Sequence, residues 1–137
     1  MSAALTPGAE VGPLRIEPIS RTTLALFAGS SGDHMPLHID IDVAKSAGMD
    51  DVFAHGMLSM AYLGRLLTDS FGVEKLRNYK VRFSAITPVH GQPTCRGTVR
   101  SIEEVEGQRL ATLDLVVALA DGTTTLIGEA VVEIDRT

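Results

Sequence analysis

The densest cluster of possible catalytic groups in this chain is the segment 32–38, GDHMPLH, with Asp40 and Asp42 just beyond it. Carboxylate and imidazole side chains are common acids and bases in proteins near neutral pH, so the cluster predicts general acid–base chemistry. Pro36 cannot donate a backbone hydrogen bond and disfavours helix at Met35, which predicts a rigid loop. We therefore expect the loop to hold its polar side chains in place.

The same residues admit other interpretations. Asp33 could be a turn aspartate that bonds to its own loop, and His38 could be a hydrogen-bonded structural histidine. A metal site of two histidines and one carboxylate is a third possibility, because His34 and His38 are four residues apart. Pro36 argues against the helix that would bring both rings to one face, so we expect no metal, and we expect His34 to lie on the surface.

Helices are expected on both sides of this loop. The segment 20–32 begins with residues that cap helices and carries apolar residues at helical spacing, and its glycines end it. Asp42 is expected to cap a short second helix. From His55 to Phe71 an apolar stripe with further apolar residues beside it predicts a long, buried central helix that ends at Gly72. His55 is expected to hydrogen-bond to the backbone at the start of this helix.

The second half of the chain has the period of β-strands. Alternation in LRNYKVRFSAI places Val81, Phe83 and Ala85 on the buried face, and Asp121-Gly122 predicts a hairpin turn. A long buried helix followed by antiparallel strands is typical of an α+β fold. We expect one domain over residues 1–137, a hot-dog fold in which a curved antiparallel sheet wraps around the helix. Residues 1–13 are expected to be an extended leader. The later strands are expected at about Thr94 to Glu104, Arg109 to Ala120 and Thr123 to Ile134.

The segment 32–38 resembles the hydratase motif of the MaoC-like dehydratase family, which runs glycine, Asp, any residue, Asn, Pro, an aliphatic residue and His. The resemblance is strongest from residue 27 to 90 and covers most of the chain. Besides the motif it rests on Phe27-Ala28-Gly29, Ala44, AHGML at 54–58 and VRFSAITPV at 81–89.

The resemblance implies an (R)-specific hydratase/dehydratase, a lyase that acts on enoyl and 3-hydroxyacyl thioesters of coenzyme A or acyl carrier protein. Asp33 and His38 would be catalytic and would hold one water molecule against the double bond. The backbone N–H of Gly56 would stabilise negative charge on the thioester carbonyl, because it stands at the positive end of a helix. No cofactor is implied.

One residue departs from the family motif, since Met35 stands where the family has Asn. A thioether cannot donate a hydrogen bond to a carboxylate, so we expect Met35 to line the substrate site instead. The departure leaves open a non-catalytic subunit that binds thioesters or partners an active one. A hot-dog thioesterase would need a carboxylate on the long helix, whereas residues 55–68 contain neither Asp nor Glu.

Composition narrows the possible partners and location. The net charge is −5, there is no Trp and aromatic residues make up 4% of the chain, so nucleic acid is not an expected partner. Cys95 is the only cysteine, which excludes an intrachain disulfide and fits a reducing cytoplasm. The sequence has no signal peptide and no apolar run of about 18 residues, so we expect no membrane association.

Assembly and substrate handling can also be predicted. A single hot-dog unit leaves strand edges open, which predicts a homodimer that joins two sheets edge to edge. Exposed cations would bind the phosphates of the thioester carrier. The candidates are Lys75, Arg77, Lys80 and, above all, Arg82.

Overall fold

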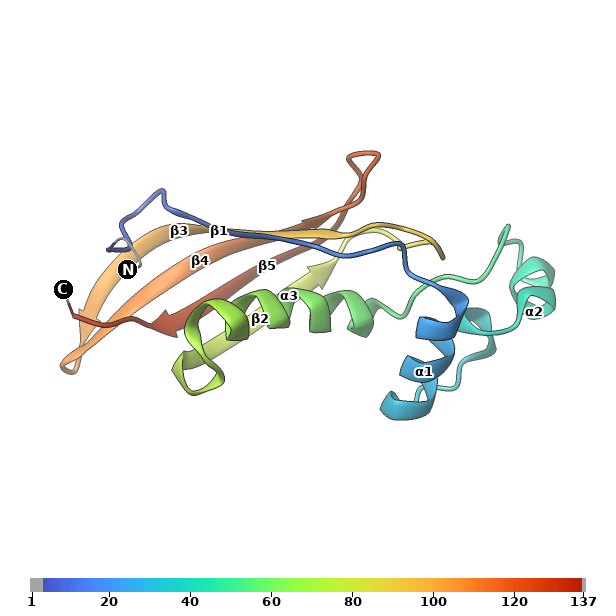
Figure 1. Ribbon diagram of the computed structural model, residues 1–137, viewed down its shortest axis with the longest axis horizontal. Helices are drawn as coiled ribbons and strands as arrows, with labels where there is room; N and C mark the ends of the chain where they lie inside the picture. The colour runs from blue at the N-terminus through green and yellow to red at the C-terminus, as the bar shows by residue number, and fades with distance from the viewer. Residues whose placement is uncertain (1–3, 137) are drawn as a thin grey trace.

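A five-stranded antiparallel sheet with one long helix across its face forms the body of the protein (Figure 1). The computed structural model describes residues 4–136. The strand order is β1-β3-β4-β5-β2, and the arrangement confirms the predicted α+β hot-dog fold. The strands are β1 (Glu10–Arg15), β2 (Leu76–Phe83), β3 (Thr94–Val105), β4 (Gln108–Ala118) and β5 (Thr124–Glu133). The helices are α1 (Arg21–Ser31), α2 (Ile41–Ser46) and α3 (Gly56–Phe71). Two short 3₁₀ turns are η1 (Pro36–His38) and η2 (Val73–Lys75).

Strands β3, β4 and β5 form the predicted meander. Glu106 and Gly107 join β3 to β4 with φ angles of 51° and 81°, which suits a tight hairpin turn that needs positive φ at both central residues. At the next turn the Asp121 carboxylate accepts the N–H of Thr123 at 2.9 Å, and Gly122 has a φ of 89°. Both turns therefore form where the sequence places a glycine after an acidic residue.

The main core lies between α3 and the sheet. Leu63, Leu66 and Leu67 of α3 are buried and pack in one cluster with inward-facing residues of β4 such as Leu113. Burial of a leucine side chain contributes roughly 1.5–3 kcal/mol, so these contacts fix the helix on the sheet. The Tyr79 hydroxyl of β2 adds a polar contact by donating to the Met60 carbonyl oxygen at 2.7 Å.

A second core lies beyond the N-terminal end of α3, where Figure 1 shows α1 and α2 standing clear of the sheet. Ser20 caps α1 by accepting the N–H of Thr23 at 3.0 Å, and Gly32 ends this helix with a φ of 76°. Asp40 caps α2, so the prediction that Asp42 would do so is wrong, and Asp42 lies in the first helical turn. The buried residues of the second core are Ile19, Leu24, Ala44, Val52, Ala54, Leu58 and Val89.

The predicted leader is partly wrong. Residues 10–13 belong to strand β1, which pairs with β3, and Val11 is 7% exposed within the main core. Gly12 and Pro13 suggested irregular chain, but an edge strand tolerates both residues where a bulge interrupts the pairing, as it does between Val11 and Leu14. Residues 1–3 of the predicted leader lie outside the described residues.

The inward face of β2 also differs from the prediction at its C-terminal end. Tyr79 and Val81 are half-buried against the main core, as alternation requires, whereas Phe83 is 51% exposed and Ala85 lies beyond the strand and is exposed. Strand β2 ends beside the N-terminal end of α3, so the helix covers less of the last residues of the strand. Within residues 4–136 no helix is long and apolar enough to cross a membrane.

Candidate active site

The loop between α1 and α2 is ordered by its own hydrogen bonds. The Asp33 N–H donates to Ser31 Oγ at 3.2 Å, and Asp33 Oδ1 accepts the N–H of Met35 at 3.2 Å. Pro36 then starts η1, in which the His38 N–H donates to the Met35 carbonyl at 3.1 Å. The backbone N–H of Met35 thus orients the carboxylate, a contact that does not involve the thioether side chain.

The ring of His38 is held in one tautomer. The His38 side chain is buried, at 9% exposure, and its Nδ1 lies 2.7 Å from the carbonyl oxygen of Phe53. A carbonyl can only accept, so Nδ1 carries the proton and the neutral ring has its lone pair on Nε2. The Phe53 ring packs edge-on against His38 at 4.9 Å between centroids. The free nitrogen of His38 therefore has a fixed direction and can act as a base.

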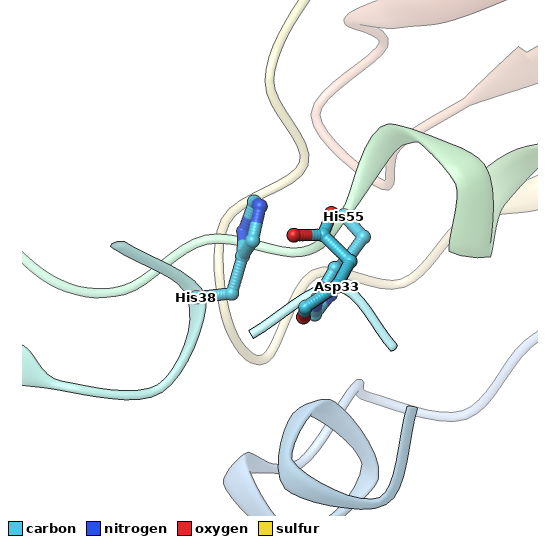
Figure 2. Close-up of side chains that lie close together, drawn as sticks. All are labelled: Asp33, His38 and His55. Atoms are coloured by element: carbon cyan, nitrogen blue, oxygen red, sulfur yellow. The ribbon is translucent and has the colours of Figure 1, made fainter. Parts of the chain in front are cut away.

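Asp33, His38 and His55 converge from three places in the chain. One oxygen or nitrogen of each side chain lies within 4.8 Å of the others. Figure 2 shows the Asp33 carboxylate turned toward the His38 ring, with His55 beside them. Asp33 is exposed, whereas both histidines are buried. The cluster thus has an open side at the carboxylate, where a small molecule can reach it.

His55 precedes α3 and was expected to bond through its ring to the backbone, and it bonds to the backbone of the loop 32–38. Its Nε2 lies 3.0 Å from the carbonyl oxygen of Asp33, and the ring stacks on His38 with 3.9 Å between centroids and 25° between planes. No function was predicted for His55. A histidine directly before the helix-starting Gly56 was the available signal.

A carboxylate and two imidazoles invite comparison with a metal centre, but the ring arrangement disfavours one. Lone pairs of imidazole lie in the ring plane, and a metal ion needs them to point at one common position. In the stacked His38 and His55 the two planes run side by side. One nitrogen of each ring bonds to a carbonyl oxygen, which leaves one free nitrogen on each ring. These residues suit proton transfer better than ligation.

The N-terminal end of α3 borders a cavity of about 320 Å³. Gly56 is the first residue of the helix, and a Cβ there would lie 3.0 Å from Cδ1 and Cε1 of Phe83. Glycine therefore lets the Phe83 ring pack directly on the start of α3, a contact that sequence spacing does not indicate. The cavity is lined by Phe53, Ala54, Gly56, Ser59, Phe83, Ser84, Ala85, Ile86, Thr87 and Leu126.

The remaining predicted residues lie at the edge of this region. Met35 is 51% exposed on the loop 32–38 and is not among the residues that line this cavity, so its part in substrate binding stays a prediction. Arg82 is exposed on β2 beside Phe83 and forms no ion pair with any residue between 4 and 136. Three other predicted cations, Lys75, Arg77 and Lys80, pair with acidic residues of the sheet or C-terminal segment.

An ion pair fixes the segment that leads into α3. Arg21 of α1 donates to both carboxylate oxygens of Asp51 at 2.9 and 2.6 Å. These bonds, together with the N–H of Val52, lower the pKa of Asp51 to about 2. The segment also bonds across to Thr87, whose carbonyl accepts the N–H of Ala54 at 2.8 Å. The carbonyl of Phe53, which holds His38, is thereby kept in place.

Comparison with known proteins gives concordant matches. A family model described as MaoC like domain matches residues 2–118. The chain is 32% identical over 125 residues to 3-hydroxyacyl-thioester dehydratase Z of Mycobacterium tuberculosis, covering 76% of this chain and 83% of that protein.

Solved structures share the fold. An (R)-hydratase from A. caviae involved in PHA biosynthesis matches with a TM-score of 0.85 at 24% identity, over 98% of this chain and 100% of that one. A chain of the ChsH1-ChsH2 complex from Mycobacterium tuberculosis matches with a TM-score of 0.82 at 19% identity, over 96% of this chain and 100% of that one.

Proposed function

This chain belongs to the MaoC-like dehydratase family, and from that premise we propose that it interconverts trans-2-enoyl and (3R)-hydroxyacyl thioesters by adding or removing water. The observation that carries the proposal is the approach of the Asp33 carboxylate to the His38 ring, whose polar atoms lie within 4.8 Å. The Nε2 of that ring is free, and Phe53, whose carbonyl holds the ring, lines the cavity at the start of α3. The acyl group would be carried by coenzyme A or an acyl carrier protein.

The pair suits a reaction that needs one base and one acid. Asp33 and neutral His38 both present acceptors, so a water molecule between them can donate one O–H to each and keep a lone pair for C3. Hydration forms a C3–O bond and a C2–H bond and breaks one O–H bond of water. Because the neutral tautomer leaves no proton on Nε2, the proton that C2 receives is the one that the pair removed from water.

Negative charge develops on the thioester carbonyl oxygen before C2 is protonated. Gly56 and Met57 occupy the first turn of α3, and their N–H groups have no carbonyl partner in the described part of the chain. Donors of this kind stabilise an oxyanion without reorganising, and the positive end of the helix dipole adds to the effect. The cavity beside Gly56 would take the reacting part of the acyl thioester.

The carrier and the assembly are part of the same proposal. Arg82, which has no acidic partner in the described chain, would bind a carrier phosphate. The chain would work as a homodimer, because among residues 4–136 β1 and β2 each have one edge without a neighbouring strand. Light scattering tests the assembly directly, and a monomer would contradict it.

A non-catalytic partner subunit is the second candidate, favoured by the similarity to a chain of the ChsH1-ChsH2 complex. A subunit without catalytic duty would have no need of a carboxylate and a free imidazole nitrogen facing one another. A thioesterase is less well supported, because the first carboxylate of α3 is the exposed Asp69 near its C-terminal end.

The experiment is the hydration of crotonyl-CoA and longer enoyl-CoA esters by the purified chain, followed by loss of the enoyl absorbance. Asp33→Asn and His38→Ala should each lower kcat by about 10²–10⁴-fold, as expected for general acid–base groups. His34→Ala is the matched control, because this exposed histidine lies on the same loop. Losses below about tenfold in both test variants would refute the roles of the pair. Turnover that appears only with a second protein would favour the partner-subunit alternative.

A further inference from the structure

His55 lies at the centre of the Asp33–His38 site without a role in the proposed water chemistry. Its side chain is 2% exposed and is enclosed by two rings. Phe27 of α1 packs edge-on against it at 4.9 Å between centroids, and His38 stacks on it at 3.9 Å. The imidazole of His55 therefore joins α1, the catalytic loop and the start of α3.

The hydrogen bonds of His55 define its tautomer. Nε2 lies 3.0 Å from the Asp33 carbonyl oxygen, so it carries the proton, and Nδ1 of the neutral ring is an acceptor. That Nδ1 is buried and has no hydrogen-bond partner among residues 4–136. Buried polar atoms are almost always paired, and exceptions call for a specific explanation. A purely structural histidine would be expected to satisfy both nitrogens.

The contacts of His55 act on both members of the proposed pair. The Nε2–H bond holds the backbone of Asp33 and thus the position from which its carboxylate extends. The stacked His55 ring supports one face of the His38 ring, and the Phe53 carbonyl fixes Nδ1 at the edge of the same ring. A neutral aromatic ring can also stabilise His38 when it takes a proton, because a cation is attracted to a π face.

We propose that His55 is a positioning residue, which holds the Asp33 backbone and supports the His38 ring so that carboxylate and Nε2 face one water molecule. The inference rests on the proposed hydratase function. It assigns to His55 no contact with the reacting atoms.

Two substitutions separate the two contacts. His55→Phe keeps a ring for stacking and loses the N–H donor, whereas His55→Gln keeps an N–H donor near the position of Nε2 and loses the ring. Each should lower kcat by about 10–100-fold with little change in KM, because a displacement of about 1 Å at a catalytic group costs on this scale. Thermal unfolding of both variants shows whether the fold persists.

A double-variant cycle distinguishes positioning from general damage. If His55 acts through Asp33, adding His55→Phe to Asp33→Asn should cost much less than it does in the wild-type background. Additive losses would overturn the proposal, as would near-normal kcat in both single variants. Unfolding of both single variants would also overturn it, since His55 would then be a residue of the core.

An NMR measurement keeps this inference separate from the proposed function. The ring protons of His38 should show an upfield ring-current shift in the wild type and in His55→Phe that is lost in His55→Gln. If the wild type hydrates no enoyl thioester, the proposed function fails, while the shift still tests the stacked arrangement. Absence of the shift in the folded wild type would overturn the positioning contact itself.

Discussion

Replacing Gly56 by alanine tests the start of α3 most directly. The added Cβ would lie 3.0 Å from two carbons of the Phe83 ring. Carbon atoms pack best at about 3.5–4.0 Å, so the ring must move by roughly 0.5–1 Å. Phe83 is 51% exposed and can yield, at an overpacking cost of about 1 kcal/mol that the better helix propensity of alanine largely offsets. The free energy of unfolding should therefore stay within about 1 kcal/mol of wild type.

Activity should respond much more strongly than stability. If the thioester carbonyl approaches the Gly56 N–H, a methyl group there displaces it, and losing one such donor costs about 10²–10³-fold in kcat. The assay is enoyl-CoA hydration beside thermal unfolding, with Phe83→Ala and the double variant as controls. Phe83→Ala relieves the contact with the new methyl but leaves that methyl in place, so the double variant should remain slow. Recovery of the double variant, or full activity of Gly56→Ala, would refute the reasoning and leave Gly56 only the task of seating Phe83.

Three further predictions concern the periphery of the site. Met35→Asn should change kcat by less than about threefold, because the backbone N–H that bonds Asp33 Oδ1 is unaffected, and steady-state kinetics checks this. Arg82→Ala should raise KM for CoA esters with little change in kcat, an effect absent with thioesters that lack phosphate. Lys80→Ala, on the same strand but paired with Glu129 at 3.6 Å, is its control. Arg21 lowers the pKa of Asp51 to about 2, so the ionised carboxylate stabilises the fold above its unfolded pKa of about 4. That contribution is lost as the pH falls toward 2, so the difference in Tm between wild type and Asp51→Asn should disappear between about pH 4 and about pH 2.

The loop 32–38 was largely predictable because its determinants are local. Pro36 stops helix formation and Gly32 ends the preceding helix, so a rigid loop with Asp33 and His38 follows from the chain itself. The orientation of Asp33 was not predictable in the same way. The family motif points to the side chain at position 35, whereas the donor is the backbone N–H of Met35, which any residue except proline can supply.

Features that depend on distant segments were harder to predict. Strict alternation placed Phe83 on the buried face, but burial requires an element on the other side, and α3 begins only there. The prediction of an extended leader missed strand β1, whose pairing partner β3 lies about 80 to 90 residues away in the sequence. His55 could be placed at a helix start, but its stacking on His38 depends on how the loop folds back onto α3.

The two cores of the molecule also have a consequence for its behaviour on heating. The site stands on the smaller core around α1 and α2, while the sheet and most of α3 belong to the larger one, and Tyr62 packs against both. Segments with fewer buried apolar contacts open at lower free energy than the rest of a protein. Local opening of the smaller core would separate Asp33 and His38 while the sheet stays folded. Enzymatic activity should therefore be lost at a lower temperature than the one at which the sheet unfolds. Amide protons of α1 and α2 should exchange with solvent before those of β4.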